Sequence, residues 1–369
     1  MRRSMRQKPN GWRRPKRSVS LPAMGQKDAS TKFTLVQALR GIAALWVVLF
    51  HAAEGKHLET IRAAAPPWLF ESIFDAGHYG VSIFFALSGF VIAHSLRHAD
   101  ATPRFAGRFI LRRSIRLDPP YWATIALVII QQTIEARIKG TAMPDVSVGQ
   151  LAAHVFYVQD IVSYPQISAV FWTLCYEIQF YLGFMLLLVV GRLIGGRGHA
   201  IVRLVMFGAA LAGAMHLYTG LPGGLALTLW HAFFVGVVAY WAGHGSWAAT
   251  FGLAALVIVI VNKGSTGDII SAATAVLLCV TLRTGSITVM MRSAPLQWLG
   301  MISYSLYLSH NIVAGSAYWA LGKMMPTGAV AEWLQLGLAT GLSLLFAYAL
   351  WWLVERPAHD FAKHVGARR

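Results

Sequence analysis

The chain has 369 residues, of which 56% are hydrophobic and only 13% are charged, and its mean hydropathy is +0.54. Soluble domains carry about 25% charged residues. This composition therefore excludes an ordinary soluble protein and predicts an all-α, polytopic membrane helix bundle. The net charge of +17 lies largely in the N-terminal tail and in short loops, where membrane topology explains it better than nucleic-acid binding does. Cys175 and Cys279 both lie in apolar runs, so no disulfide framework is expected.

The first 32 residues are strongly basic, with ten Lys or Arg residues, one acidic residue and no apolar run. Such a segment predicts a disordered cytoplasmic tail next to anionic lipid. It is a poor signal peptide, because the basic region is too long and no small-residue cleavage site follows. Met24 is an alternative start of the chain.

Ten apolar spans follow, each near the length that a bilayer requires. We expect residues 33–358 to form the membrane domain and residues 359–369 a short cytoplasmic tail. Lys and Arg concentrate in alternate loops, most of all in residues 97–118, so both termini are predicted to be cytoplasmic. The ten spans are roughly 35–53, 79–96, 119–136, 170–190, 201–218, 225–242, 248–262, 268–283, 298–319 and 333–354.

Arg40 and His51 lie in the first span, eleven residues apart. On a helix they are separated by roughly 16 Å along the axis and point to about the same side. One is a cation near a membrane surface and the other a titratable base at depth, a costly placement that usually has a function. The alternative is structural, with Arg40 snorkelling at the helix entrance and His51 a satisfied histidine near the far interface.

The loop before the third span carries Arg108, Arg112 and Arg116 at four-residue intervals. On a helix these residues form one cationic stripe. Arginine suits phosphate because its planar guanidinium binds two oxygens at once. A basic cytoplasmic loop needs positive charge but not this spacing, so the stripe is interpreted as a set of phosphate ligands.

The start of the second span is rich in small residues, among them Gly80, Ser82, Ser88 and Gly89. These are interpreted as positions of close helix packing. The fourth span contains an acid, Glu177, expected to be a partner for a base or a sugar hydroxyl, or else an interhelical hydrogen-bond acceptor.

The ninth span contains His310, to which a structural or cavity-lining role is assigned. The sequence has no His-Glu-x-x-His motif, no paired cysteines, no Gly-x-Ser-x-Gly elbow and no P-loop, so neither a metal site nor ATP hydrolysis is predicted.

Taken together, these patterns resemble the acyltransferase-3 family of integral membrane acyltransferases, from about residue 34 to 358. Each motif is weak by itself, but six occur in the family's order. They are Arg40-x10-His51; Gly80-Val81 with Phe84-Phe85 and Ser88-Gly89-Phe90; Arg112-x3-Arg116 with Pro120-Tyr121; Trp172, Glu177 and Phe180-Tyr181; Gly300 with Ser303 to His310; and Glu355-Arg356-Pro357. Asp118-Pro119 and Tyr176 depart from the usual pattern, and the appended hydrolase-like domain of some members is absent.

The resemblance implies an acyl-coenzyme A donor, expected to be acetyl-CoA, and a hydroxyl acceptor on a cell-surface or exported polysaccharide. His51 is expected to be the general base, and Glu177 to orient the imidazole or the acceptor. The donor phosphates are assigned to Arg40, Arg112, Arg113 and Arg116, and the acceptor to Trp172, Tyr181 and His310.

The expected location is the bacterial inner membrane, with membrane lipid and polysaccharide-assembly proteins as further partners. Two alternatives stay open at this point. One is a transporter or flippase without acyl chemistry, which internal repeats and broken helices would indicate. The other is an acyltransferase that uses succinyl-CoA, which residue patterns do not distinguish from acetyl-CoA.

Overall fold

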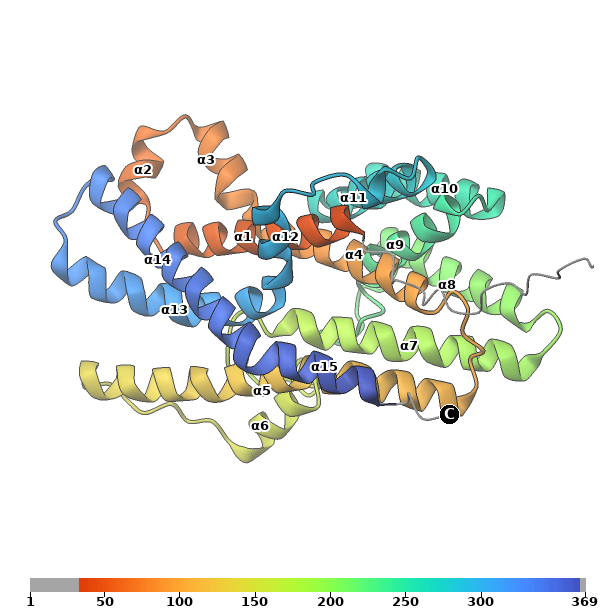
Figure 1. The fold of residues 1–369 in the computed structure, drawn as a ribbon, viewed down its shortest axis with the longest axis horizontal. Helices are drawn as coiled ribbons and strands as arrows, with labels where there is room; N and C mark the ends of the chain where they lie inside the picture. Colours follow the sequence, from red (N-terminus) through yellow and green to blue (C-terminus); the bar gives the residue numbers. More distant parts are fainter. Residues whose placement is uncertain (1–32, 366–369) are drawn as a thin grey trace, which may run out of the picture. The chain divides into compact units, whose positions relative to one another are not determined.

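Every regular element in the computed structural model, which describes residues 33–365, is helical (Figure 1). The expected basic tail, residues 1–32, lies outside the described residues. The elements are α1 (Thr34–Glu54), α2 (Glu59–Ala64), α3 (Pro67–Ile73), η1 (Asp75–Tyr79), α4 (Gly80–Ser95), α5 (Pro103–Lys139), α6 (Val148–Val155), α7 (Trp172–Ile194), α8 (Gly198–Ala214), α9 (Trp230–Gly243), α10 (Trp247–Lys263), α11 (Thr266–Arg283), η2 (Ser286–Thr288), α12 (Ala294–Met301), α13 (Ser303–Met324), α14 (Ala329–Leu350), η3 (Trp351–Glu355) and α15 (Arg356–His364).

Each of the ten predicted spans overlaps one long helix: α1, α4, α5, α7, α8, α9, α10, α11, α13 or α14. The all-helical prediction is confirmed for the part of the chain that the structure describes. Five helical stretches there are long and apolar enough to cross a membrane: Thr34–Glu54, Pro67–Ser95, Trp172–Ile194, Thr266–Arg283 and Ala329–His364. The number of membrane crossings and the side of the termini stay predictions.

The third span differs most from the sequence prediction. Residues 97–118 were expected to be mainly a loop, but α5 begins at Pro103 and runs for 37 residues through Pro119 and Pro120. The helix has an N-cap, because the Thr102 side chain accepts a hydrogen bond from the backbone N–H of Phe105. The basic stripe and the third span are therefore one continuous helix, which fixes the arginines relative to the membrane domain.

Helix α9 is the centre of one half of the bundle, with α4, α8, α10 and α11 packed around it. Twelve of its fourteen residues are buried, as expected for a helix that is apolar on all sides. Two glycines allow it to approach α4 closely. A Cβ at Gly89 would lie 1.8 Å from the carbonyl oxygen of Phe233, and one at Gly236 would lie 1.9 Å from that of Ala86. The predicted close packing at Gly89 is thus confirmed.

Gly89→Ala is expected to lower the stability of the protein by about 1–3 kcal/mol, because the methyl group overlaps helix backbone that must move away. The measurement is the apparent melting temperature of the detergent-solubilised protein. Gly107→Ala in α5 is the matched control, since a Cβ there has no neighbour within 4 Å. Equal melting temperatures for the two variants would contradict the packing argument.

Candidate active site

His51 lies in the last turn of α1, with 15% of its side chain exposed. Its Nδ1 is 2.8 Å from Oε2 of Glu54. A carboxylate that accepts a hydrogen bond keeps the imidazole proton on Nδ1, which leaves Nε2 with a free lone pair. Glu54 was not predicted from the sequence, although its position three residues after His51 on the same helix was a usable signal.

His310 of α13 is fully buried, and its ring centroid lies 5.1 Å from that of His51. Its Nδ1 is 3.0 Å from the carbonyl oxygen of Leu306 and 2.9 Å from that of Tyr307. Because carbonyl oxygens only accept, Nδ1 carries the proton and Nε2 is the acceptor. That Nε2 is buried and has no hydrogen-bond partner among residues 33–365. The structure therefore brings His51 and His310 together as two imidazoles, each with an acceptor nitrogen.

A second group of predicted residues lines one cavity of about 120 Å³ between α1, α4, α5, α7 and α13. Its charged lining residues are Arg40, Arg113, Arg116 and Glu177, with Tyr181 beside them. Four of the predicted donor or acceptor ligands thus share this cavity with Glu177. Arg112 does not line the cavity; it donates from Nε to the carbonyl of Val365.

The arginines of the cavity are incompletely paired. Nε of Arg40 and Nε of Arg113 are buried, and neither has a hydrogen-bond partner in the described part of the chain. The guanidinium of Arg113 lies over the ring of Tyr181, 3.6 Å from its centroid, which is a cation–π contact. Buried guanidinium donors without a partner are costly unless an anion pairs with them. The cavity is therefore suited to an anionic group.

Glu177 accepts hydrogen bonds from the hydroxyls of Ser88, at 2.7 Å, and of Tyr181. Glu54, and not Glu177, contacts the His51 imidazole. The Ser88 contact is the interhelical hydrogen bond that was the alternative for Glu177, and its role toward the acceptor stays a prediction. Ser88, interpreted from the sequence only as a packing residue, thus also donates a hydrogen bond to the Glu177 carboxylate. Trp172 does not line the cavity; it packs edge-on against Phe85 and Tyr176.

Another acid, Glu355 of η3, accepts a hydrogen bond from the Ser305 hydroxyl at 2.6 Å. It is buried and lies within electrostatic range of Arg40 and Arg116. Glu355 belongs to the Glu-Arg-Pro motif noted in the sequence, where no role was assigned to it. Its carboxylate balances part of the positive charge of the cavity.

Asp118, which departs from the family pattern, anchors the segment between α5 and α7. It is buried, and it accepts hydrogen bonds from Ser114 and from the Tyr157 hydroxyl, the latter at 2.9 Å. Tyr157 stacks on Tyr121 with ring centroids 4.8 Å apart. The segment continues to Thr173, whose hydroxyl is 2.9 Å from that of Tyr307 at the cavity. Asp118 thus helps to position one wall of the cavity.

Tyr157→Phe is expected to destabilise the protein by about 1.5–3 kcal/mol, because a buried carboxylate loses a donor. Asp118→Asn alone should lower the stability by less. The double variant Asp118→Asn/Tyr157→Phe should be no less stable than Tyr157→Phe. A double-mutant cycle of thermal unfolding measures this coupling. Additive losses in the cycle would show that the two side chains do not act as a pair.

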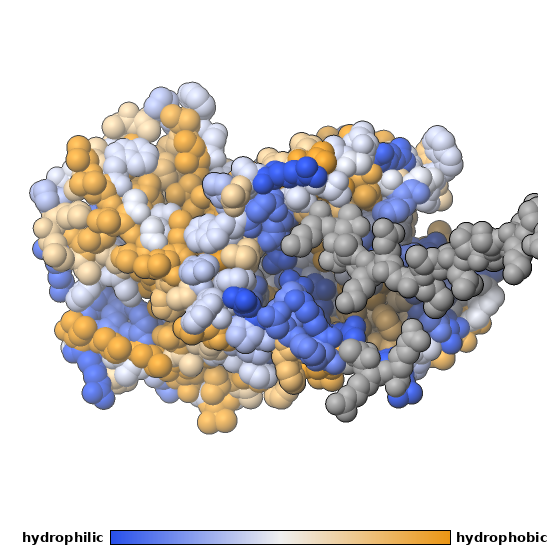
Figure 2. All heavy atoms as spheres, in the orientation of Figure 1, coloured by the Kyte–Doolittle hydropathy of each residue, from blue (hydrophilic) through white to orange (hydrophobic). Residues whose placement is uncertain are grey.

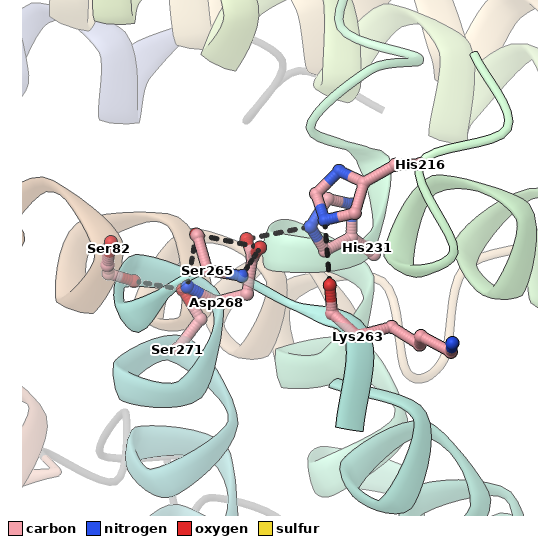
Figure 3. Close-up of polar contacts among 7 residues, drawn as sticks. All are labelled: Ser82, His216, His231, Lys263, Ser265, Asp268 and Ser271. Carbon is pink, nitrogen blue, oxygen red and sulfur yellow. Dashed lines mark hydrogen bonds and ion pairs between the residues drawn. The ribbon is translucent and has the colours of Figure 1, made fainter. Parts of the chain in front are cut away.

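A third polar group lies away from this site (Figure 3). Nε2 of His231 in α9 is 2.8 Å from Oδ1 of Asp268 in α11, and Asp268 also forms a capping box with Ser265. His216 is 3.1 Å from the carbonyl of Lys263. The His231–Asp268 pair joins the start of α9 to the start of α11. The His216 contact joins the loop after α8 to the end of α10. Both contacts are structural. Within residues 33–365, no group of three or more His, Cys, Asp or Glu side chains has the arrangement of a metal site.

The cavity and the histidine pair occur in a chain whose family can be assigned. A family model described as an acyltransferase domain, acyltransferase-3, matches residues 35–352. The chain belongs to the acyltransferase-3 family. It is therefore an acyltransferase of the membrane, which requires an acyl donor and a glycan or lipid acceptor. The family assignment favours this enzyme class over the transporter alternative.

Two relatives support the assignment. Nodulation protein 10 of Rhizobium leguminosarum bv. viciae is 26% identical over 379 residues, covering 90% of this chain and 94% of that protein. Protein 2 in picA locus of Rhizobium radiobacter is 34% identical over 101 residues, covering 26% of this chain and 44% of that protein. No solved structure matches the chain.

Proposed function

We propose that this acyltransferase moves an acyl group, expected to be acetyl, from acyl-CoA to a hydroxyl of a cell-surface or exported polysaccharide. The observation that carries the proposal is the cavity in which Arg40, Arg113 and Arg116 meet, two of them with unused buried donors. Coenzyme A carries several phosphates, which match arginine in charge and geometry. Arg40 shares α1 with His51, so the same helix connects the proposed donor site to the proposed base.

The proposed location is the bacterial inner membrane, with ten crossings and both termini in the cytoplasm. Donor would then enter from the cytoplasmic side, where the positive-inside rule assigns the arginine-rich start of α5. The thioester arm of the donor extends from the arginines toward His51, along a path of roughly 16 Å for eleven helical residues. Polysaccharide-assembly proteins are proposed to present or receive the acceptor.

In the proposed reaction, Nε2 of His51 takes the proton of the acceptor hydroxyl. The oxygen attacks the thioester carbonyl, the carbon–sulfur bond breaks, and the imidazolium returns its proton to the leaving thiolate. Glu54, 2.8 Å from Nδ1, stabilises the imidazolium formed on the way. Tyr181, Trp172 and His310 are proposed to contact the acceptor or the acyl chain, with Trp172 acting from the rim because it does not line the cavity.

The test compares surface glycans by mass spectrometry in cells with the wild-type protein, with the gene deleted, and with His51→Ala at matched protein level. Loss of one acyl mass in both variants supports the proposal and identifies the acyl group. Release of free thiol by the purified protein from acetyl-CoA or succinyl-CoA identifies the donor. Unchanged glycans after deletion would exclude a surface polysaccharide as the acceptor.

A further inference from the structure

A much larger groove lies between the C-terminal half of α5 and the facing sides of α13 and α14. Its volume is about 1200 Å³, compared with about 120 Å³ for the arginine-lined cavity. In Figure 1 the C-terminal half of α5 lies at the left with α13 and α14, and Figure 2 shows broad apolar areas on that part of the surface. None of the residues assigned to the donor or to the base lines this groove.

The walls of the groove are apolar and open. Ile130 and Ile134 of α5 are 54% and 53% exposed, and Leu345 of α14 is 66% exposed. Ile130, Ile134 and Ile138 recur every four residues and so form one stripe along α5. In a membrane protein such a stripe contacts hydrocarbon rather than water.

Polar groups gather among these apolar walls. Gln131 donates to Glu135 at 2.8 Å, and Lys139 is paired with the same carboxylate. His57, from the loop after α1, stacks on Tyr318 with ring centroids 4.0 Å apart. Burial lowers the pKa of His57, so its imidazole is neutral at neutral pH. Long apolar walls with a few hydrogen-bonding groups match an amphiphile better than they match an apolar protein helix.

The groove shares helix α13 with the histidine pair. Asn311 and Ile312 of α13 line it, and they directly follow His310, whose ring is 5.1 Å from that of His51. His57 lines it as well and lies six residues after His51. Helix α13 thus contributes to the groove and carries His310 beside the proposed base, and the loop after α1 connects His51 to His57 at the groove.

We propose that this groove holds the hydrocarbon chain of a membrane-anchored amphiphile whose hydroxylated head is the acceptor at His51. The binding of a hydrocarbon chain is argued from the groove alone. The placement of its head as the acceptor at His51 rests on the proposed function. The acceptor of this enzyme is then a lipid-linked glycan within the bilayer, and not a free polysaccharide.

Gly315 of α13 provides a sharp test. It lines the groove, and a Cβ at this position has no neighbour within 4 Å. Gly315→Trp therefore places a large side chain at the groove from a position where its Cβ meets no neighbour. Gly337→Trp is the matched control, because Gly337 on α14 has equally open space but does not line the groove.

The first readout is photolabelling in nanodiscs with dodecyl glucoside that carries a diazirine in its alkyl chain. Adducts mapped by mass spectrometry are expected on α5 and α13 at the groove. They should fall at least fivefold in Gly315→Trp and stay unchanged in Gly337→Trp. Two outcomes would overturn the proposal. One is adducts away from the groove, as expected if the alkyl chain binds another face or if a second copy of the protein covers the groove. The other is labelling of the groove that Gly315→Trp does not reduce.

The second readout is acyl transfer from acetyl-CoA to glucose and to octyl, decyl and dodecyl glucosides. Transfer is expected to rise at least tenfold from glucose to the longest chain and to lose this dependence in Gly315→Trp, while thiol release without acceptor stays at the wild-type rate. Equal transfer to glucose would overturn the lipid-linked acceptor. Absence of thiol release from any donor by the wild type would reject the proposed function, while the photolabelling still reports on the groove.

Discussion

Replacing His51 by alanine is expected to lower the rate of acyl transfer by about 10²–10⁴-fold, the usual contribution of a positioned base. The Michaelis constant for the donor should stay unchanged, because the arginines of the cavity are intact. His51 is suited to the role since Glu54 holds its Nδ1 at 2.8 Å and leaves Nε2 to accept a proton. The measurement is steady-state thiol release from acetyl-CoA in the presence of a glycan acceptor.

Two companion variants make this prediction specific. Glu54→Gln should lower the rate less than His51→Ala, because the amide keeps a hydrogen bond but does not stabilise an imidazolium. His98→Ala is the control, since His98 is exposed after the end of α4 and has no proposed role. Near-wild-type transfer by a well-folded His51→Ala protein would remove His51 from the mechanism.

Arg116→Ala is expected to raise the Michaelis constant for acetyl-CoA by about 10–100-fold, with a smaller effect on kcat. This range corresponds to the loss of one charge-assisted hydrogen bond, about 1.5–3 kcal/mol. Arg116→Lys should recover only part of the affinity, because an ammonium does not bind two phosphate oxygens in a plane. Donor titrations on the purified protein measure both constants.

A matched control lies on the same helix. Arg108 is exposed and does not line the cavity, so Arg108→Ala should leave the Michaelis constant within about twofold of wild type. A donor without phosphates, S-acetyl-N-acetylcysteamine, should be transferred equally well by wild type and Arg116→Ala. If Arg116→Ala weakened this small thioester as much as acetyl-CoA, the residue would not be a phosphate ligand.

Much of the fold could be predicted from local patterns. Apolar runs of membrane length located ten long helices, because hydrocarbon requires every backbone group to be hydrogen-bonded within its own helix. The basic stripe was described only on the condition that the loop is helical, and α5 meets that condition from Pro103 onward. Its continuity with the third span was missed, since Pro119 and Pro120 were taken as the start of a helix, whereas α5 continues through both.

The site was predicted less completely. Arg40, Arg113, Arg116, Glu177 and Tyr181 were singled out along the sequence, and the structure brings them into one cavity. The contacts between these side chains could not be predicted from the sequence. Glu177 was expected near His51 as one possibility, but its partners are Ser88 of α4 and Tyr181, one turn further along its own helix α7.

The sequence by itself determined the class of protein, the helices and the residue types available for chemistry, because hydropathy and helical periodicity are local properties. The tertiary structure alone decided that Glu54 and His310 accompany His51, that Arg112 lies outside the cavity, and that α5 and α14 leave an open groove beside α13. Those features depend on how helices pack against one another. Packing follows from the shapes of side chains distant in sequence, and no single segment encodes it.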